Sequence, residues 1–222
     1  MLHTGDGQGS HENSVVMNEL DIGAAAQAAV RTHQMPVNGS LRPYVSALVG
    51  LEMDNIGPVA MAAAPHDAMV IGVPFAHNRG ANDIKGELGA NTLVNGIRQW
   101  TGNYTAPGDC VTLFALLTPL GAVQILNSRR LDDTPRLRVP LANLLDMRRV
   151  RDLESRVAVA GDLPAKLAAF GAWLEERAHE RGLQDRDAMR AARAAMRLCA
   201  EPTAHMDRVA DEQHVSRRQV ER

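Results

Sequence analysis

The sequence is poor in aromatic residues, in cysteine and in long apolar runs. Seven of its 222 residues are Phe, Trp or Tyr, which is few for a β-rich protein. No stretch approaches the run of about 18 apolar residues that a membrane span needs, so a membrane partner is not expected. Its two cysteines, Cys110 and Cys199, are too few for a disulfide scaffold and suit a reducing compartment. The N-terminus lacks the basic segment and apolar run of a secretory signal, and we expect a cytoplasmic protein.

Lysine is scarce as well, and the charges divide unevenly along the chain. Residues 1–120 hold 5 Lys and Arg against 10 Asp and Glu, whereas residues 121–222 hold 19 against 16. Among those 19 cations, Lys166 is the exception to arginine. The planar guanidinium of arginine pairs well with phosphates and carboxylates, although a GC-rich coding bias also enriches arginine. The division indicates two parts with different partners.

Short apolar runs separated by Gly, Pro, Asn and Asp predict a β-rich domain over residues 35–138. Residues 1–34 are rich in Gly, Ser, His and Asn, and we expect them to form a poorly ordered leader. Several strands at this spacing are typical of a sandwich or a barrel. The strands expected are Val45–Leu51, Val59–Ala63, Ala68–Val73, Thr92–Arg98 and Cys110–Leu117, with Val123–Ile125 as a further candidate.

After these strands the apolar period changes from two toward 3.6, which predicts a helical connector over residues 139–183. Val150, Leu153 and Val157 share one face of its first helix. Asp162 can cap its second helix. The apolar face of that second helix is expected to hold Leu167, Phe170, Leu174 and Ala178. The fold class predicted for the chain is α+β.

A third helix, expected at about Asp185–Cys199, carries a stripe of arginines. They stand at Arg186, Arg190, Arg193 and Arg197, with spacings of 4, 3 and 4 residues. The stripe suits either a solvated face beside a core seam or a helix that lies along a phosphate backbone.

The last twenty residues predict two further short helices joined by a tight turn. Thr203 can cap the first, and Ser216 can begin the second with a capping box to Gln219. His214 stands in the turn, where glycine is usual, and histidine tolerates the left-handed conformation better than most residues. Two short helices, the second rich in arginine, indicate a helix-turn-helix.

The segment VADEQHVSRRQVER resembles the first helix-turn-helix of the AraC/XylS family of bacterial transcription regulators. The upstream segments SLRPYVSALVGLE, APHDAMVIGVPF and FALLTPLGAVQILN resemble a β-rich sensor module of that family. The resemblance implies that residues 184–222 begin the DNA-binding domain. The implied helix-turn-helix core is Val209, Ala210, Val215 and Val220, and the implied DNA-binding residues are Ser216, Arg217, Arg218, Glu221 and Arg222.

Among these residues Arg218, Glu221 and Arg222 would share the face that reads base edges, and Arg217 would contact phosphate. Family members carry two such helix-turn-helix units, whereas this sequence stops at Arg222 inside the second helix of the first. We therefore expect an incomplete DNA-binding domain with weak or absent operator binding. DNA would be the partner of a complete domain, and a small-molecule effector and a second copy of the chain are further expected partners.

The sequence offers little enzyme chemistry, and no cofactor or metal is expected. His66, Asp67, His77 and Glu87 lie in the region where a cupin-like barrel could bind a metal, but their spacing matches no ligand pattern. No serine elbow, phosphate-binding loop or cysteine pair occurs. The aromatic candidates for a sensor pocket are Trp100, Tyr104, Phe75 and Phe114.

The leading hypothesis is thus a non-enzymatic transcription regulator. The alternative is a stand-alone ligand-binding or dimerisation module that does not bind DNA, and a small cupin-like enzyme is a third interpretation.

Overall fold

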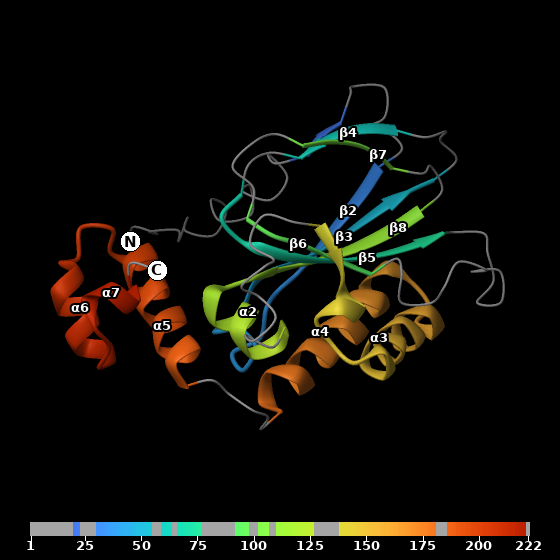
Figure 1. The fold of residues 1–222 in the computed structure, drawn as a ribbon. Helices are drawn as coiled ribbons and strands as arrows, with labels where there is room; N and C mark the ends of the chain where they lie inside the picture. Colours follow the sequence, from blue (N-terminus) through green and yellow to red (C-terminus); the bar gives the residue numbers. More distant parts are fainter. Residues whose placement is uncertain are drawn as a thin grey trace, which may run out of the picture.

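The protein has an α+β fold in its computed structural model (Figure 1). The structure describes residues 20–22, 30–54, 59–63, 66–76, 92–97, 102–106, 110–126, 138–180 and 186–220. Two antiparallel sheets are formed, one of six strands and one of three. Helices lie against one side of the six-stranded sheet, and three further helices gather beside it (Figure 1).

The six-stranded sheet has the order β2-β3-β8-β5-β6-β9, so the long strands β3, β8 and β5 are central. Its strands are β2 (Val30–Met35), β3 (Val45–Met53), β8 (Cys110–Leu117), β5 (Met69–Ala76), β6 (Leu93–Asn95) and β9 (Arg138–Pro140). The smaller sheet pairs β1 (Leu20–Ile22), β4 (Val59–Ala63) and β7 (Gly102–Ala106) in the order β1-β4-β7.

Two helices, α3 (Met147–Val159) and α4 (Leu163–His179), cover one face of the large sheet (Figure 1). Gly50 of β3 allows the close approach, because a Cβ there would come within 2.5 Å of Leu163 Cδ1. The short helix η4 (Leu141–Asn143) leads into α3. The core between sheet and helices includes Leu48, Ile71, Leu113, Phe170 and Trp173.

The helices of the connector form as predicted. Asp162 caps α4, since its carboxylate Oδ1 accepts a hydrogen bond of 2.9 Å from the Ala165 amide. Val150, Leu153 and Val157 are fully buried on one side of α3. The ammonium of Lys166 donates to the carbonyl oxygens of Val157 and Ala160 at 3.1 and 2.6 Å, which satisfies the C-terminal end of α3.

Five strand predictions are confirmed with shifts of a few residues, and one is wrong. Residues 123–125 belong to the helix α2 (Pro119–Leu126). Thr118 Oγ1 accepts from the Gly121 amide at 3.0 Å and Pro119 begins the helix, so this end has a normal helix cap. A short apolar run cannot by itself distinguish a strand from a buried helix.

The prediction of a poorly ordered leader needs correction at its C-terminal end. Strand β2 begins at Val30 and pairs along β3 from Val30↔Met53 to Met35↔Leu48, and Leu20–Ile22 forms β1. Most side chains of β2 are exposed, so the strand has no apolar alternation to reveal it. Its backbone pairing with the edge of β3 determines its structure.

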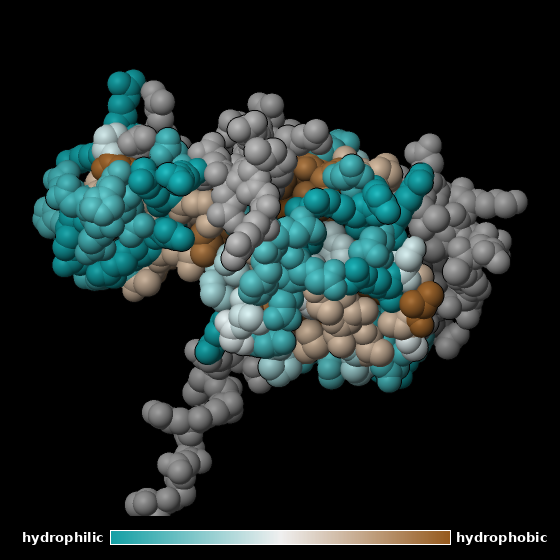
Figure 2. Space-filling view, turned by 90° about the horizontal axis from the view of Figure 1, so that it is seen from below, coloured by the Kyte–Doolittle hydropathy of each residue, from teal (hydrophilic) through white to brown (hydrophobic). Residues whose placement is uncertain are grey.

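The outer side of the α3–α4 pair is partly apolar (Figure 2). Val159 is 84% exposed at the end of α3. Ala165, Ala168 and Ala172 are exposed along α4 at helical spacing. Among the described helices, none is long and apolar enough to cross a membrane.

Candidate nucleic-acid interface

The helices α5 (Arg186–Ala200), α6 (Met206–Gln213) and α7 (Arg217–Val220) pack against one another at the C-terminal end of the chain. We call them the C-terminal helical unit; its surface is mostly hydrophilic (Figure 2). Val209 and Ala210 of α6 are buried, as expected for the small residues where two helices cross closely. Thr203 does not cap α6: the cap position belongs to His205, whose side chain makes no capping bond.

A left-handed turn at His214 joins α6 to α7. His214 has φ 53° and ψ 43° and, within the described residues, is the one non-glycine residue with positive φ. The Val215 amide donates to the Ala210 carbonyl at 3.0 Å, and the His214 amide donates to the Asp211 carbonyl at 3.1 Å. These two bonds form a Schellman arrangement, which satisfies the last carbonyls of α6 and reverses the chain.

A ring of two arginines and two glutamates connects α5 to α6. Arg197 pairs with Glu201 at 2.6 Å and with Glu212 at 3.5 Å. Arg208 pairs with the same two carboxylates at 3.1 and 3.7 Å. Hydrogen bonds from Arg197 and Arg208 hold the pKa of the Glu201 carboxyl below its usual range. The ring thus connects the end of α5 with α6 through side chains that are partly exposed.

Ion pairs involve two of the four arginines in the stripe on α5. Arg197 belongs to the ring, and Arg190 pairs with Asp187 at 3.5 Å. Arg193 and Arg186 are exposed. Two of the four charges are therefore matched by carboxylates of the same unit, which favours a solvated face over a helix that follows a phosphate backbone.

The DNA-binding residues implied by the resemblance lie at the start of α7 and beyond it. Ser216, Arg217 and Arg218 are exposed, and Arg217 lies 3.5 Å from Asp207 of α6. Val215 is half-buried in the turn. Val220 ends α7, but its side chain, like that of Gln219, is outside the described residues. Glu221 and Arg222 are outside them as well, so the proposed base-reading face is described at Arg218 alone.

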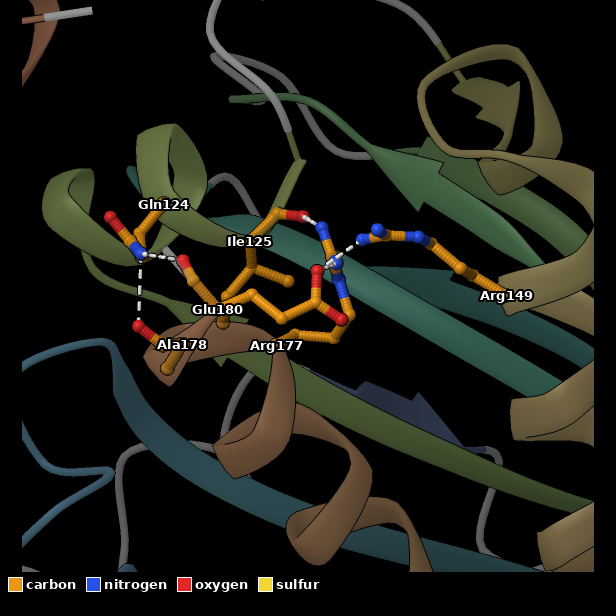
Figure 3. Close-up of polar contacts among 6 residues, drawn as sticks. All are labelled: Gln124, Ile125, Arg149, Arg177, Ala178 and Glu180. Carbon is orange, nitrogen blue, oxygen red and sulfur yellow. Dashed lines mark hydrogen bonds and ion pairs between the residues drawn. The ribbon is translucent and has the colours of Figure 1, made fainter. Parts of the chain in front are cut away.

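A polar cluster that the sequence did not reveal lies where α2, α3 and α4 meet (Figure 3). The Glu180 carboxylate, just after α4, accepts from both Arg149 and Arg177. Gln124 of α2 donates to the carbonyl oxygens of Ala178 at 2.9 Å and Glu180 at 3.4 Å. Arg177 is only 8% exposed, and its position on the apolar side of α4 was the available signal.

The same signal applies to a second buried pair. Glu154 lies on the apolar side of α3, beside Leu153 and Val157, and is buried. It accepts a hydrogen bond of 2.6 Å from Thr92 Oγ1, which ties α3 to the segment before β6. A charged residue at a core-facing helical position predicts such a partner.

Two of the four aromatic pocket candidates, Phe75 and Phe114, have described side chains, and these lie on opposite faces of the sheet. Phe75 packs against the core between sheet and helices. Phe114 is opposite Gly72 and Val49 in the register and lies on the other face of the sheet. The side chains of Trp100 and Tyr104 are outside the described residues.

Of the four candidate metal ligands, two lie among the described residues and two lie outside them. His66 Nδ1 lies 2.7 Å from the Ala68 carbonyl oxygen, next to Asp67, whereas His77 and Glu87 are outside the described residues. In the part of the chain that the structure describes, no group of three His, Cys, Asp or Glu could hold a metal. Cys110 is buried and Cys199 is exposed, and both are free thiols.

Comparison with known proteins gives a single weak likeness. No family model matches the chain, and no curated protein matches it. Among solved structures it is similar to the AraC-like transcriptional activator CuxR, with 9% sequence identity and a TM-score of 0.31 over 88% of this chain and 80% of that one. A likeness at this TM-score carries no argument about function.

Proposed function

We propose that the protein is a transcription regulator of the AraC/XylS type that contacts duplex DNA through the helices α6 and α7. One observation carries this proposal: the left-handed turn at His214 joins two short helices, the second of which begins with exposed arginines. The resemblance of residues 209–222 to the family pattern gives the same assignment independently of the geometry.

The physical role of each part follows from this arrangement. The buried pair Val209 and Ala210 lets α6 pack closely on its neighbours and leaves α7 on the surface. Arg217 and Arg218 at the start of α7 can pair with phosphate oxygens or with the O6 and N7 atoms of guanine. In a helix-turn-helix it is this second helix that enters the major groove.

The six-stranded sheet would be the sensor. Its face opposite α3 and α4 carries buried apolar side chains, Val49 and Leu51 among them, beside half-buried Phe114. We propose that a small apolar effector binds on this face and that two copies of the chain associate through the apolar outer side of α3 and α4. The same sheet face would also serve the alternative function, a ligand-binding module that acts without DNA.

The test is the binding of the full chain to a fluorescently labelled duplex from the region upstream of its own coding sequence. We expect dissociation constants in the range of non-specific phosphate binding, about 1–100 µM at physiological salt. Arg217→Gln with Arg218→Gln should weaken binding at least several-fold. The matched control is Arg42→Gln with Arg151→Gln, which removes two exposed charges elsewhere. Equal binding by the two double variants, or no binding at all, would refute the proposal.

A further inference from the structure

Helix α2 lies between the sheet and the C-terminal helical unit (Figure 1). Its sequence, PLGAVQIL, is apolar on all sides apart from Gln124. A helix of this kind needs to be covered on all sides. Ile125 and Leu126 belong to the core between sheet and helices, whereas Leu120 and Ala122 are buried without belonging to it. Helix α5 contacts α2, as α4 and β8 do, and can contribute to covering them.

The position of α2 is fixed by the ends of two central strands. Thr118, directly after β8, donates from its amide to the Tyr44 carbonyl at 3.0 Å and from its hydroxyl to the Pro43 carbonyl at 2.7 Å. Tyr44 directly precedes β3. Gly121 packs so closely on the Tyr44 carbonyl that a Cβ there would overlap it. Helix α2 must therefore follow any movement of this corner of the sheet.

The end of α4 is tied to the C-terminal end of α2 (Figure 3). Gln124 donates to the carbonyls of Ala178 and Glu180, and Arg177 Nη2 donates to the Ile125 carbonyl at 3.4 Å. Two buried atoms in this cluster, Gln124 Oε1 and Arg177 Nε, have no hydrogen-bond partner among the described residues. Buried polar atoms without a partner cost free energy.

Helix α5 is built to pack on two sides. Ala192 and Ala194 are both buried, although residues two positions apart on a helix point about 200° away from each other. One side of α5 contacts α2, and the other contacts α6 and α7. We propose that α2 is the element through which strands β3 and β8 set the position of the C-terminal helical unit.

This regulation rests on the proposed function, because it places DNA-binding helices under the control of the sheet. A ligand that favours one arrangement of the β3–β8 corner would favour one position of α2 and hence of α5. The physical link is a chain of contacts that runs from Tyr44 and Thr118 through α2 to α5. Spatial continuity alone does not prove such coupling, so the test perturbs each end separately.

The packing of α5 on α2 is tested by substitutions at Leu120 in the full chain. The measurement is the hydrogen exchange of the α5 amides. Leu120→Gln should raise their exchange rate about tenfold or more, and the milder Leu120→Ala several-fold, because each loses buried contact. The control His33→Gln alters an exposed position on β2 and should change nothing. Fluorescence of the buried Trp173 reports that the core stays folded. Unchanged α5 exchange in both Leu120 variants would overturn the docking.

Coupling is tested at Thr118, which lies outside α5. Thr118→Val removes the helix cap and the bond to Pro43, and should raise α5 exchange several-fold. Thr32→Val, at an exposed position of β2, is the control. No rise in Thr118→Val would overturn the coupling. Hydrogen exchange of α5 is measured without DNA. A failure of the chain to bind DNA would therefore refute the proposed function but would not affect this test of the contact between α2 and α5.

Discussion

At the scale of single residues, Gly121 is the position with the least room. Gly121→Ala would press a Cβ into the Tyr44 carbonyl oxygen, and backbone cannot move aside as a flexible side chain can. We expect a loss of about 3 kcal/mol or more in the free energy of unfolding, despite the better helix propensity of alanine. Urea denaturation followed by circular dichroism measures it.

Two other glycines provide a graded control for this prediction. Gly50→Ala meets the end of the Leu163 side chain, which can turn, so we expect a cost of about 1–2 kcal/mol. Gly161→Ala meets nothing within 4 Å and should stay within about 0.5 kcal/mol of the original chain. A cost for Gly121→Ala no larger than that for Gly161→Ala would contradict the close approach of α2 to the sheet.

His214 is the second residue whose backbone conformation decides its effect. Because a left-handed conformation disfavours residues with a Cβ, His214→Gly should stabilise the turn by about 0.5–1 kcal/mol. Hydrogen exchange of the α6 amides should then slow by about two- to fivefold. His214→Val should accelerate it, since β-branched residues fit this conformation poorly. Acceleration by glycine would argue against the left-handed turn.

At the scale of elements, the ring of ion pairs between α5 and α6 should respond to pH and salt. The pKa of Glu201 is lowered in the folded chain, so its contribution is complete above the ordinary value of 4.5 and is lost as the pH falls through the lower, folded value. Glu201→Gln should raise α5 and α6 exchange near neutral pH. This difference should shrink as the pH falls through the lowered pKa of Glu201, where the carboxylate of the original chain also becomes protonated.

The control for the ring is Asp211→Asn, which alters an exposed carboxylate of α6 outside the ring. High salt should reduce the effect of Glu201→Gln as well, because exposed ion pairs are screened. An effect of Glu201→Gln that stays the same in 1 M salt and at low pH would show that the ring does not hold α5 to α6.

The elements also differ in how far the sequence predicts them. The apolar spacing of Val150, Leu153 and Val157, and the cap at Asp162, predict α3 and α4 because these signals are local. Strand β2 has exposed side chains and depends on pairing with β3, and α2 has an apolar run too short to show its period. The polar cluster at Arg177 joins three helices: Arg177 and Glu180 are three residues apart, but Arg149 and Ile125 are distant in the sequence, and no local pattern contains them.

The candidate site shows the same limit. The turn at His214 and the burial of Val209 and Ala210 follow from the short pattern at the C-terminal end. The ion pairs that occupy Arg190 and Arg197 depend on how α5 and α6 pack, which the pattern does not contain. Those pairs matter for function, since they involve two of the four stripe arginines of α5, whereas Arg217 and Arg218 are exposed at the start of α7.

At the scale of the whole molecule, a sheet with one face under helices is linked through α2 to a small, mostly hydrophilic helical unit (Figure 1). The arginine-rich second half of the sequence, residues 121–222, includes α3 and α4 on the sheet as well as the helical unit. Such an arrangement suits a protein in which one part binds an effector and the other binds a polyanion.

The salt dependence of duplex binding tests the proposed DNA contact most directly. Each phosphate contact adds about −0.9 to the slope of log K against log salt concentration. If Arg217 and Arg218 contact the backbone, the slope for Arg217→Gln with Arg218→Gln should be less negative by about 1 to 2, and the slope for Arg42→Gln with Arg151→Gln should not change. Identical slopes for the original chain and the Arg217/Arg218 variant would contradict DNA binding through α7.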